Sequence, residues 1–136
     1  MLFFCFVRLF LAKICSIIIL VIDMSNRIIF HVDVNNAFLS WTAVSLLRQN
    51  YPIDIRKIPS VIGGDESKRH GIVLAKSPVA KKYGIKTAET LYSARKKCSE
   101  LKIFPPDYKW YYKISNEFHM YLKKFSPNIL KYSVDE

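Results

Sequence analysis

The chain of 136 residues carries 21 lysines and arginines against 11 acidic residues, a formal net charge of +10, and 51% of it is hydrophobic. This length suits one ordinary domain, the apolar content argues against a chain disordered as a whole, and the charge favours a polyanionic partner such as nucleic acid or an anionic membrane surface. The three widely spaced cysteines form no metal-like cluster and are interpreted as reduced thiols of a cytosolic protein.

The first 22 residues are an apolar leader that contains no acid and two cations, Arg8 and Lys13. Its length would suffice for a membrane-spanning helix, but each cation near the centre of a span costs about 2.5–3.5 kcal/mol. No small-residue cleavage site marks a signal peptide. The leading interpretation is that residues 1–23 are an extension outside a domain that begins at Met24, and a membrane anchor comes second.

From Met24 the pattern becomes that of an α/β domain. A nearly unbroken apolar run predicts a central strand over residues 28–34. Asn35 or Asn36 can cap the helix that follows, whose apolar face includes Phe38 and Trp41. Pro52 then interrupts the helical pattern, which predicts a connecting segment.

The second half alternates short strands and helices. Strands are predicted at 60–64, 70–75 and 101–104, and helices at 77–84 and 88–98. Pro78 lies in the first turn of the helix at 77–84, and Gly84 caps its end. The longest helix follows "PPD" and stops before Pro127. Residues 128–136 are predicted to return as a strand.

Positive charge is concentrated between Lys68 and Lys102. This stretch holds ten lysines and arginines and two acids, Glu89 and Glu100, and so carries +8 of the +9 found after residue 23. A solvated surface is the ordinary explanation for charged residues. The size of this excess favours a surface that faces phosphates.

Two of the predicted strands end in carboxylates, the first in Asp33 and the last in Asp135 and Glu136. Mg²⁺ prefers oxygen ligands, and two such ions can bridge an attacking hydroxyl and a leaving phosphate. If the strands are neighbours, these acids form a metal site, and if not, they are ordinary surface acids. Spacing alone leaves both alternatives open. Nearby His31 is interpreted as a structural histidine, because Mg²⁺ has little use for imidazole.

Five stretches, in order and at sensible spacing, carry a family resemblance: "HVDVNNAFLSW", "VIGG", "RHGIVLAKSPVAKKYGIKTAETLYSARKKC", "LKIFPPDYKWYYKISNEFHMYL" and "FSPNILKYSVDE". Together they resemble the N-terminal part of the Y-family, DinB/UmuC-like translesion DNA polymerases. The last is close to that family's Ser-Ile-Asp-Glu signature. The resemblance covers residues 24–136. It implies an incomplete α+β palm with a ferredoxin-like mixed sheet (24–44 and 101–136), a small inserted fingers subdomain (45–100), and no thumb or little finger.

The resemblance also implies roles for particular residues. Asp33, Asp135 and Glu136 would be catalytic and, with the backbone carbonyl of Val34, would hold two Mg²⁺ ions. Phe38 would be the steric gate that packs under the sugar and rejects a ribose 2′-hydroxyl. Without the resemblance, Phe38 would be interpreted as a core residue.

Nucleotide contacts are implied for Asn36, Ser77 and Lys81. Lys81 stands where the family commonly has an arginine that touches the incoming triphosphate. The neighbouring tyrosine of the family is replaced here by Pro78, which cannot donate a hydroxyl hydrogen bond. Ser77 or Lys76 is the candidate substitute.

The function implied is part of a DNA-directed DNA polymerase, a nucleotidyltransferase for error-prone translesion synthesis in DNA repair, although the truncated chain alone is expected to be inactive. Expected partners are damaged primer–template DNA and deoxynucleoside triphosphates, with a sliding clamp as a candidate for a full-length form, in the cytoplasm and away from membranes. One alternative is a non-catalytic basic module that binds nucleic acid or nucleotide. Another is a membrane-tethered protein that uses residues 1–22.

Overall fold

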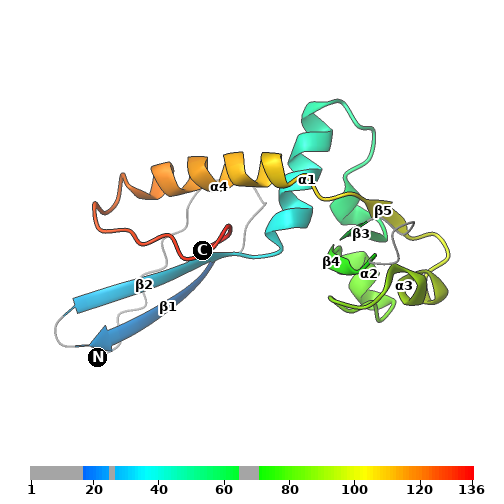
Figure 1. Cartoon of the computed structure of the whole chain (residues 1–136), viewed down its shortest axis with the longest axis horizontal. Coiled ribbons are helices and arrows are strands. Elements are labelled where there is room, and N and C mark those ends of the chain that lie inside the picture. The colour runs from blue at the N-terminus through cyan, green and yellow to red at the C-terminus, as the bar shows by residue number, and fades with distance from the viewer. Residues whose placement is uncertain (1–16, 25–26, 65–70) are drawn as a thin grey trace.

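The structure, a computed structural model, describes residues 17–24, 27–64 and 71–136, with side chains from Phe30 onward. In chain order its elements are β1 (Ile17–Met24), β2 (Arg27–Val34), α1 (Ala37–Arg48), the 3₁₀ helix η1 (Ile55–Lys57), β3 (Ser60–Gly63), β4 (Val73–Lys76), α2 (Pro78–Lys82), α3 (Leu91–Lys97), β5 (Lys102–Phe104) and α4 (Tyr108–Leu122). Figure 1 shows α1 between the β1–β2 ribbon with α4 on one side and the small sheet with α2 and α3 on the other. The mixed α/β class predicted from the sequence is confirmed.

The predicted strand at 28–34 is present as β2, which pairs antiparallel with β1 from Ile17↔Val34 to Met24↔Arg27. Residues 17–23 were expected to lie outside the domain, and here the structure differs. Their backbone belongs to β1, and the run of β-branched residues in "IIILVI" suits a strand. The rest of the proposed extension, residues 1–16, lies outside the described residues. Within the described part of the chain, no helix is long and apolar enough to cross a membrane.

The small sheet has the order β4-β3-β5, with β3 antiparallel to β4 and parallel to β5. Strand β3 passes close to α3 at Gly63, where a Cβ would lie 2.7 Å from Cδ2 of Leu91 and 3.2 Å from the carbonyl oxygen of Ile72, so a side chain here would require the Leu91 side chain to shift. The core under this sheet consists of Val61, Val73, Ala80, Ile85, Leu91, Ala94, Cys98 and Leu101. Strand β5 comes from the segment predicted as palm (101–136) and pairs with β3, which comes from the segment predicted as fingers (45–100). The division into palm and fingers stays a prediction.

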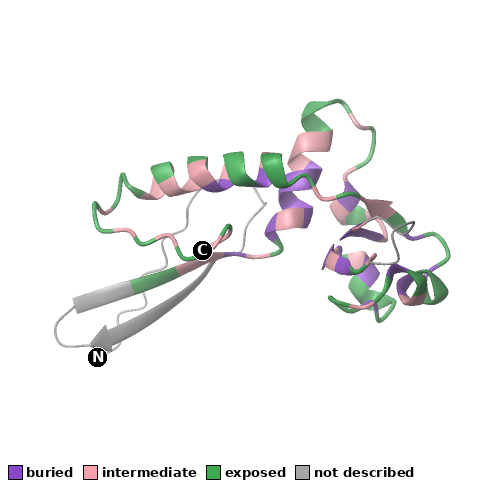
Figure 2. Ribbon diagram, in the orientation of Figure 1, coloured by how far each residue is buried: buried purple, intermediate pink, exposed green. Residues whose placement is uncertain are grey.

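Helix α1 is buried on two sides, as Figure 2 shows. Leu39 and Ala43 pack with Ile62 and Ala75 of the small sheet. On the other side Trp41 packs with Tyr111 of α4. Apolar residues on both faces make α1 the element that joins the two parts of the chain.

Hydrogen bonds reinforce the contact between α1 and α4. The indole Nε1 of Trp110 donates to the carbonyl oxygen of Trp41 at 2.9 Å. The hydroxyl of Thr42 donates its one hydrogen to the carbonyl of Phe38 at 2.8 Å, so the phenol of Tyr111, 2.6 Å away, must donate to Thr42. Burial raises the pKa of Tyr111 above its ordinary value, although the hydrogen bond with Thr42 opposes this effect.

The expected return strand at 128–136 does not form. The segment runs without regular structure between α4 and β2 (Figure 1). The Lys131 ammonium donates to Oδ1 of Asn116 on α4 at 2.9 Å, and the carbonyl of Asp135 accepts one bond from the amide of Val34 at 3.0 Å. The amides of Tyr132 and Ser133 turn to the carbonyl of Glu136 instead of to β2. One backbone bond makes no ladder, so the segment lies beside β2 without extending its sheet.

Candidate active site

A cleft of about 520 Å³ lies where the N-terminus of α1 meets β4 and α2. Its lining includes five of the residues that the sequence analysis assigned to the site, namely Asn36, Phe38, Ser77, Lys81 and Asp135. They come from the β2–α1 turn, α1, the β4–α2 junction, α2 and the C-terminal segment. The fold therefore brings together residues up to 99 positions apart in the sequence.

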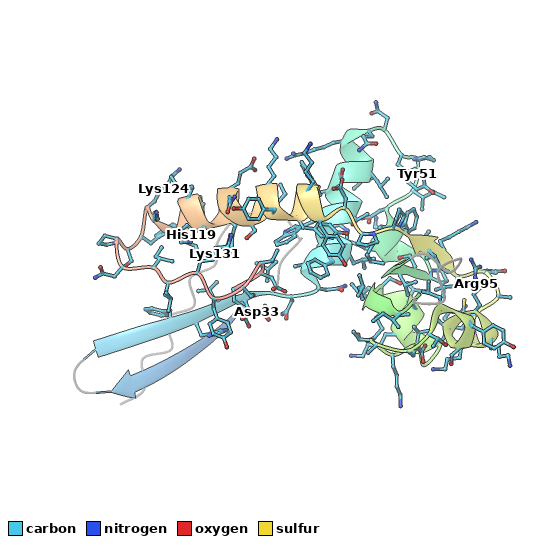
Figure 3. The ribbon with its side chains drawn as sticks, in the orientation of Figure 1. Asp33, Tyr51, Arg95, His119, Lys124 and Lys131 are labelled. Carbon is cyan, nitrogen blue, oxygen red and sulfur yellow. The ribbon has the colours of Figure 1, made fainter. Side chains whose placement is uncertain are left out.

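The metal-ligand candidates lie at the end of β2 and in the adjacent C-terminal segment. Asp33 is half-buried near the end of β2 (Figure 3). The bond from the Val34 amide to the Asp135 carbonyl holds the two segments side by side. Glu136 directs Oε1 to Nε2 of His31 at 3.4 Å, and Oδ1 of Asp135 accepts from the Ser133 hydroxyl at 3.0 Å.

The two backbone segments that carry these side chains lie next to each other, but the side chains do not form a closed metal site. Among the residues that the structure describes, no three histidine, cysteine, aspartate or glutamate side chains are close enough to hold one ion. The oxygens of Asp33, Asp135 and Glu136 and the carbonyl of Val34 are still the hard donors that suit a divalent cation. The donor set fits Mg²⁺, provided that Asp135 and Glu136 exchange their contacts with Ser133 and His31 for the ion.

Phe38 faces both the cleft and the core. Its ring stacks on Tyr111 with centroids 4.8 Å apart, and it also lies 6.5 Å from the rings of Trp41 and Tyr108. The side chain is only partly buried, and it forms part of the cleft wall. Phe38 therefore packs against the core and also lines the cleft, and its role as a steric gate stays a prediction.

Ser77 is fully buried, and its hydroxyl is fully used by the protein. It donates to the carbonyl of Ile58 at 2.7 Å and accepts from the amides of Ala80 at 2.9 Å and Ser60 at 3.2 Å. One hydrogen and two lone pairs are all that a hydroxyl offers. The hydroxyl expected to contact the nucleotide instead caps α2 and anchors the loop before it.

Asn36 stands at the N-terminus of α1 but does not cap it through its side chain. Its backbone is left-handed, with φ 54° and ψ 41°, and its amide Nδ2 donates to the carbonyl of Lys76 at 3.0 Å. The Lys76 ammonium donates in turn to Oγ1 of Thr87 at 2.9 Å. Sequence reasoning missed Thr87, which also lines the cleft, because no local pattern distinguishes it from other surface threonines.

Several described lysines of the basic segment lie at the surface of α2 and α3. Lys81 and Lys82 of α2 and Lys96 of α3 are exposed, and Lys81 lines the cleft. The Lys97 ammonium is engaged, because it pairs with the Glu89 carboxylate and donates to the Gly84 carbonyl. Burial is the largest single effect on Glu89 and acts to raise its pKa, but the hydrogen bonds and positive charges of Lys97 and Lys86 together outweigh it, and the pKa lies below its ordinary value.

Comparison with known proteins gives consistent matches. The model of the impB/mucB/samB family matches residues 32–136. DNA polymerase IV of Clostridium acetobutylicum is 61% identical over 111 residues, which are 82% of this chain and 28% of that protein. DNA polymerase IV of Alkaliphilus oremlandii is 38% identical over 111 residues, again 82% of this chain and 26% of that protein.

Solved structures show the same fold. DinB from Sulfolobus solfataricus superposes with a TM-score of 0.59 at 22% identity, and a Y-family DNA polymerase chimera superposes with a TM-score of 0.60 at 20% identity. Each superposition covers 74% of this chain and 28% of the other. The chain thus spans about a quarter of the length of the curated relatives that it matches.

Proposed function

Because this chain belongs to the impB/mucB/samB family of Y-family, DinB/UmuC-like proteins, we propose that it forms the palm–fingers part of a DNA-directed DNA polymerase that copies damaged DNA. The observation that carries the proposal is the cleft, where Phe38 and Lys81 face the same space as Asp135. A deoxynucleoside triphosphate needs a wall for its sugar, a cation for its phosphates and carboxylates near its α-phosphate. The cleft offers the first two and one carboxylate residue, Asp135. Asp33 and Glu136 do not line it, and they would have to approach the nucleotide from the adjacent end of β2 and from the chain end.

In the proposed reaction a primer 3′-hydroxyl attacks the α-phosphate of the nucleotide, and pyrophosphate leaves. Asp33, Asp135, Glu136 and the Val34 carbonyl would hold two Mg²⁺ ions, which supply Lewis-acid activation of the hydroxyl and charge stabilisation on the phosphates. The carboxylates orient the reacting groups from the palm side.

The fingers side would hold the rest of the nucleotide. Lys81, exposed on α2 and lining the cleft, would bind the triphosphate. Phe38, backed by the stacked ring of Tyr111, would press against C2′ of the sugar and exclude a 2′-hydroxyl. Ser77 keeps the loop before α2 in place, so its contribution to nucleotide binding would be indirect.

The proposed partners are damaged primer–template DNA and deoxynucleoside triphosphates, with a sliding clamp in a longer form of the protein, in the cytoplasm. The second candidate function is a basic module that binds nucleotide or nucleic acid without catalysis. It is favoured by one observation, the engagement of the Asp135 and Glu136 carboxylates with Ser133 and His31.

A chimeric enzyme tests the proposal. The segment of Clostridium acetobutylicum DNA polymerase IV that aligns with this chain, 61% identical, is replaced by this chain's residues. We expect the chimera to extend a primer across an abasic site. We expect Asp33→Asn or Asp135→Asn to reduce extension by at least about a hundredfold, because each removes several kcal/mol of metal-mediated stabilisation. The exposed Glu100→Gln is the matched control and should remain active.

An inactive chimera would decide between the two candidate functions. A chimera that folds, binds primer–template DNA and adds no nucleotide would contradict the polymerase proposal and support the non-catalytic module.

A further inference from the structure

One side chain connects the two halves of the candidate site. Asn36 donates its amide hydrogen to the carbonyl of Lys76 at 3.0 Å, although the two residues are 40 positions apart. Asn36 belongs to the turn between β2 and α1, two positions after Val34. Lys76 ends β4, immediately before the cap of α2. Both residues line the cleft.

The carbonyl of Lys76, which accepts this hydrogen bond, belongs to a firmly held segment. The residue after it, Ser77, donates its amide to the carbonyl of Ser60 at 2.8 Å and uses its hydroxyl in three further bonds. The Lys76 side chain is bonded to Thr87. The carbonyl of Lys76 is therefore a fixed point on the fingers, and a bond to it fixes the β2–α1 turn.

The turn itself restricts which residue can stand at this position. A φ of 54° favours glycine, asparagine or aspartate over other residues. Glycine has no side chain, and an ionised aspartate has no hydrogen to donate to a carbonyl. Of these three, only asparagine satisfies both the left-handed backbone and the bond to Lys76.

We propose that Asn36 is a positioning residue that aligns the metal-ligand turn with the triphosphate loop, an inference that rests on the proposed function. Asp33 and Val34 lie just before Asn36, and Lys81 lies on the helix that follows Lys76. A nucleotide bound by both the divalent cation and Lys81 needs these two groups at a set separation. The hydrogen bond from the Asn36 side-chain amide to the Lys76 carbonyl sets this separation, and Asn36 does not itself contact the nucleotide.

The expected consequence is a coupling between metal and nucleotide binding. The probe is dATP, bound to the 136-residue chain with Mg²⁺ or with EDTA, and the readout is the ratio of the two dissociation constants. In Asn36→Gly, which keeps the turn relaxed and deletes the bond, this ratio should fall about three- to tenfold, the value of one hydrogen bond. The dissociation constant in EDTA should change by less than about twofold.

Two further variants keep the test decisive. Asn36→Ala also deletes the bond but strains the left-handed turn, so its melting temperature should be lower than that of Asn36→Gly while its loss of coupling is the same. Asn35→Ala, in the same turn, is the control and should retain the full ratio. Equal coupling in Asn36→Gly and the unmodified chain would overturn the proposal, and so would weaker binding of Asn36→Gly in EDTA, which would indicate direct nucleotide contact.

Failure of the proposed function gives a different result. An unmodified chain whose affinity for dATP does not respond to Mg²⁺ would overturn both the metal site and this inference. A normal Mg²⁺ response that persists in Asn36→Gly and Asn36→Ala would overturn the role of Asn36 and leave the proposed function standing.

Discussion

The ring of Phe38 lies stacked on the ring of Tyr111, with centroids 4.8 Å apart and planes 14° apart. Tyr111 is itself fixed, because it is buried and its phenol bonds to Thr42. A ring that lines the cleft is thereby backed by a rigid partner 73 residues further along the chain, on α4. Such backing is what a steric gate requires, since a gate that yields does not discriminate between sugars.

Replacing Phe38 by alanine should therefore have two effects. The free energy of unfolding should fall by about 2–3 kcal/mol, less than for a fully buried phenylalanine, because the side chain is only partly buried. The preference for dATP over ATP should fall about tenfold, because the gap admits a 2′-hydroxyl. Thermal unfolding and the two dissociation constants measure these effects.

Phe118→Ala is the control for Phe38. Phe118 is partly buried in the same cluster but does not line the cleft, so it should cost stability and leave the sugar preference unchanged. If Phe38→Ala behaves in the same way as Phe118→Ala, Phe38 is a core residue only.

Lys81 and Lys82 form a matched pair, since both are exposed on α2 and only Lys81 lines the cleft. Lys81→Ala should weaken dATP binding about three- to tenfold at low salt, whereas Lys82→Ala should change it less than about twofold. The difference should shrink as salt rises, because exposed charges are screened. Calorimetric titration at several salt concentrations measures it, and identical behaviour of the two variants would remove Lys81 from the site.

Ser77→Ala should destabilise the fold by about 2–4 kcal/mol, because it removes a helix cap and deprives the partly buried carbonyl of Ile58 of its donor. The comparison is Thr90→Ala, an exposed cap of α3 with a single bond at 3.2 Å, which should cost about 0.5–1 kcal/mol. Chemical denaturation gives both values. Below its melting range, the Ser77 variant should keep its affinity for dATP, and a large loss there with little destabilisation would restore the direct nucleotide contact.

Asp54 supplies a pH-dependent contribution to stability. Its carboxylate accepts bonds from the Arg56 side chain at 2.7, 2.8 and 3.1 Å, and these hold the pKa of Asp54 below its ordinary value of 3.8. A lowered pKa means that folding favours the ionised form, so the contribution is present above pH 3.8 and is lost as the pH falls through the lower folded value.

Asp54→Asn should therefore be less stable than the unmodified chain at pH 7 by about 0.5–1 kcal/mol, as expected for an ion pair near the surface. The difference should vanish as the pH falls below 3.8. Denaturation at a series of pH values measures it. In an Arg56→Met background the same substitution should show little pH dependence, and an unchanged dependence there would assign the effect to another group.

Much of the fold follows from local patterns in the sequence. The apolar run at 28–34 is β2, the helical pattern after Asn36 is α1, and the long helix before Pro127 is α4. Gly84 ends α2 in a left-handed conformation, as its position after "AKKY" indicates. Periodicity, caps and terminators act over a few residues, so each of these elements is encoded within its own segment.

The candidate site residues were predicted from the family resemblance, and five of them line one cleft in the structure. Local patterns could not have selected them, since Phe38 alone looks like a core residue and Lys81 like a surface lysine. Their common property is the space they face, and that space exists only once α1, α2 and the C-terminal segment are packed together.

Tertiary structure alone decided how the hydrogen-bonding groups pair. Residues 17–23 pair with β2 although they were expected outside the domain, and the described backbone shows one bond between β2 and residues 128–136, where a strand was expected. The Asn36 amide bonds to Lys76 instead of capping α1, and the Ser77 hydroxyl is used up within the protein. A hydrogen-bond donor or an unpaired strand edge can pair with any partner of suitable geometry. Which partner it meets, often tens of residues away, depends on packing, and no local sequence pattern contains that information.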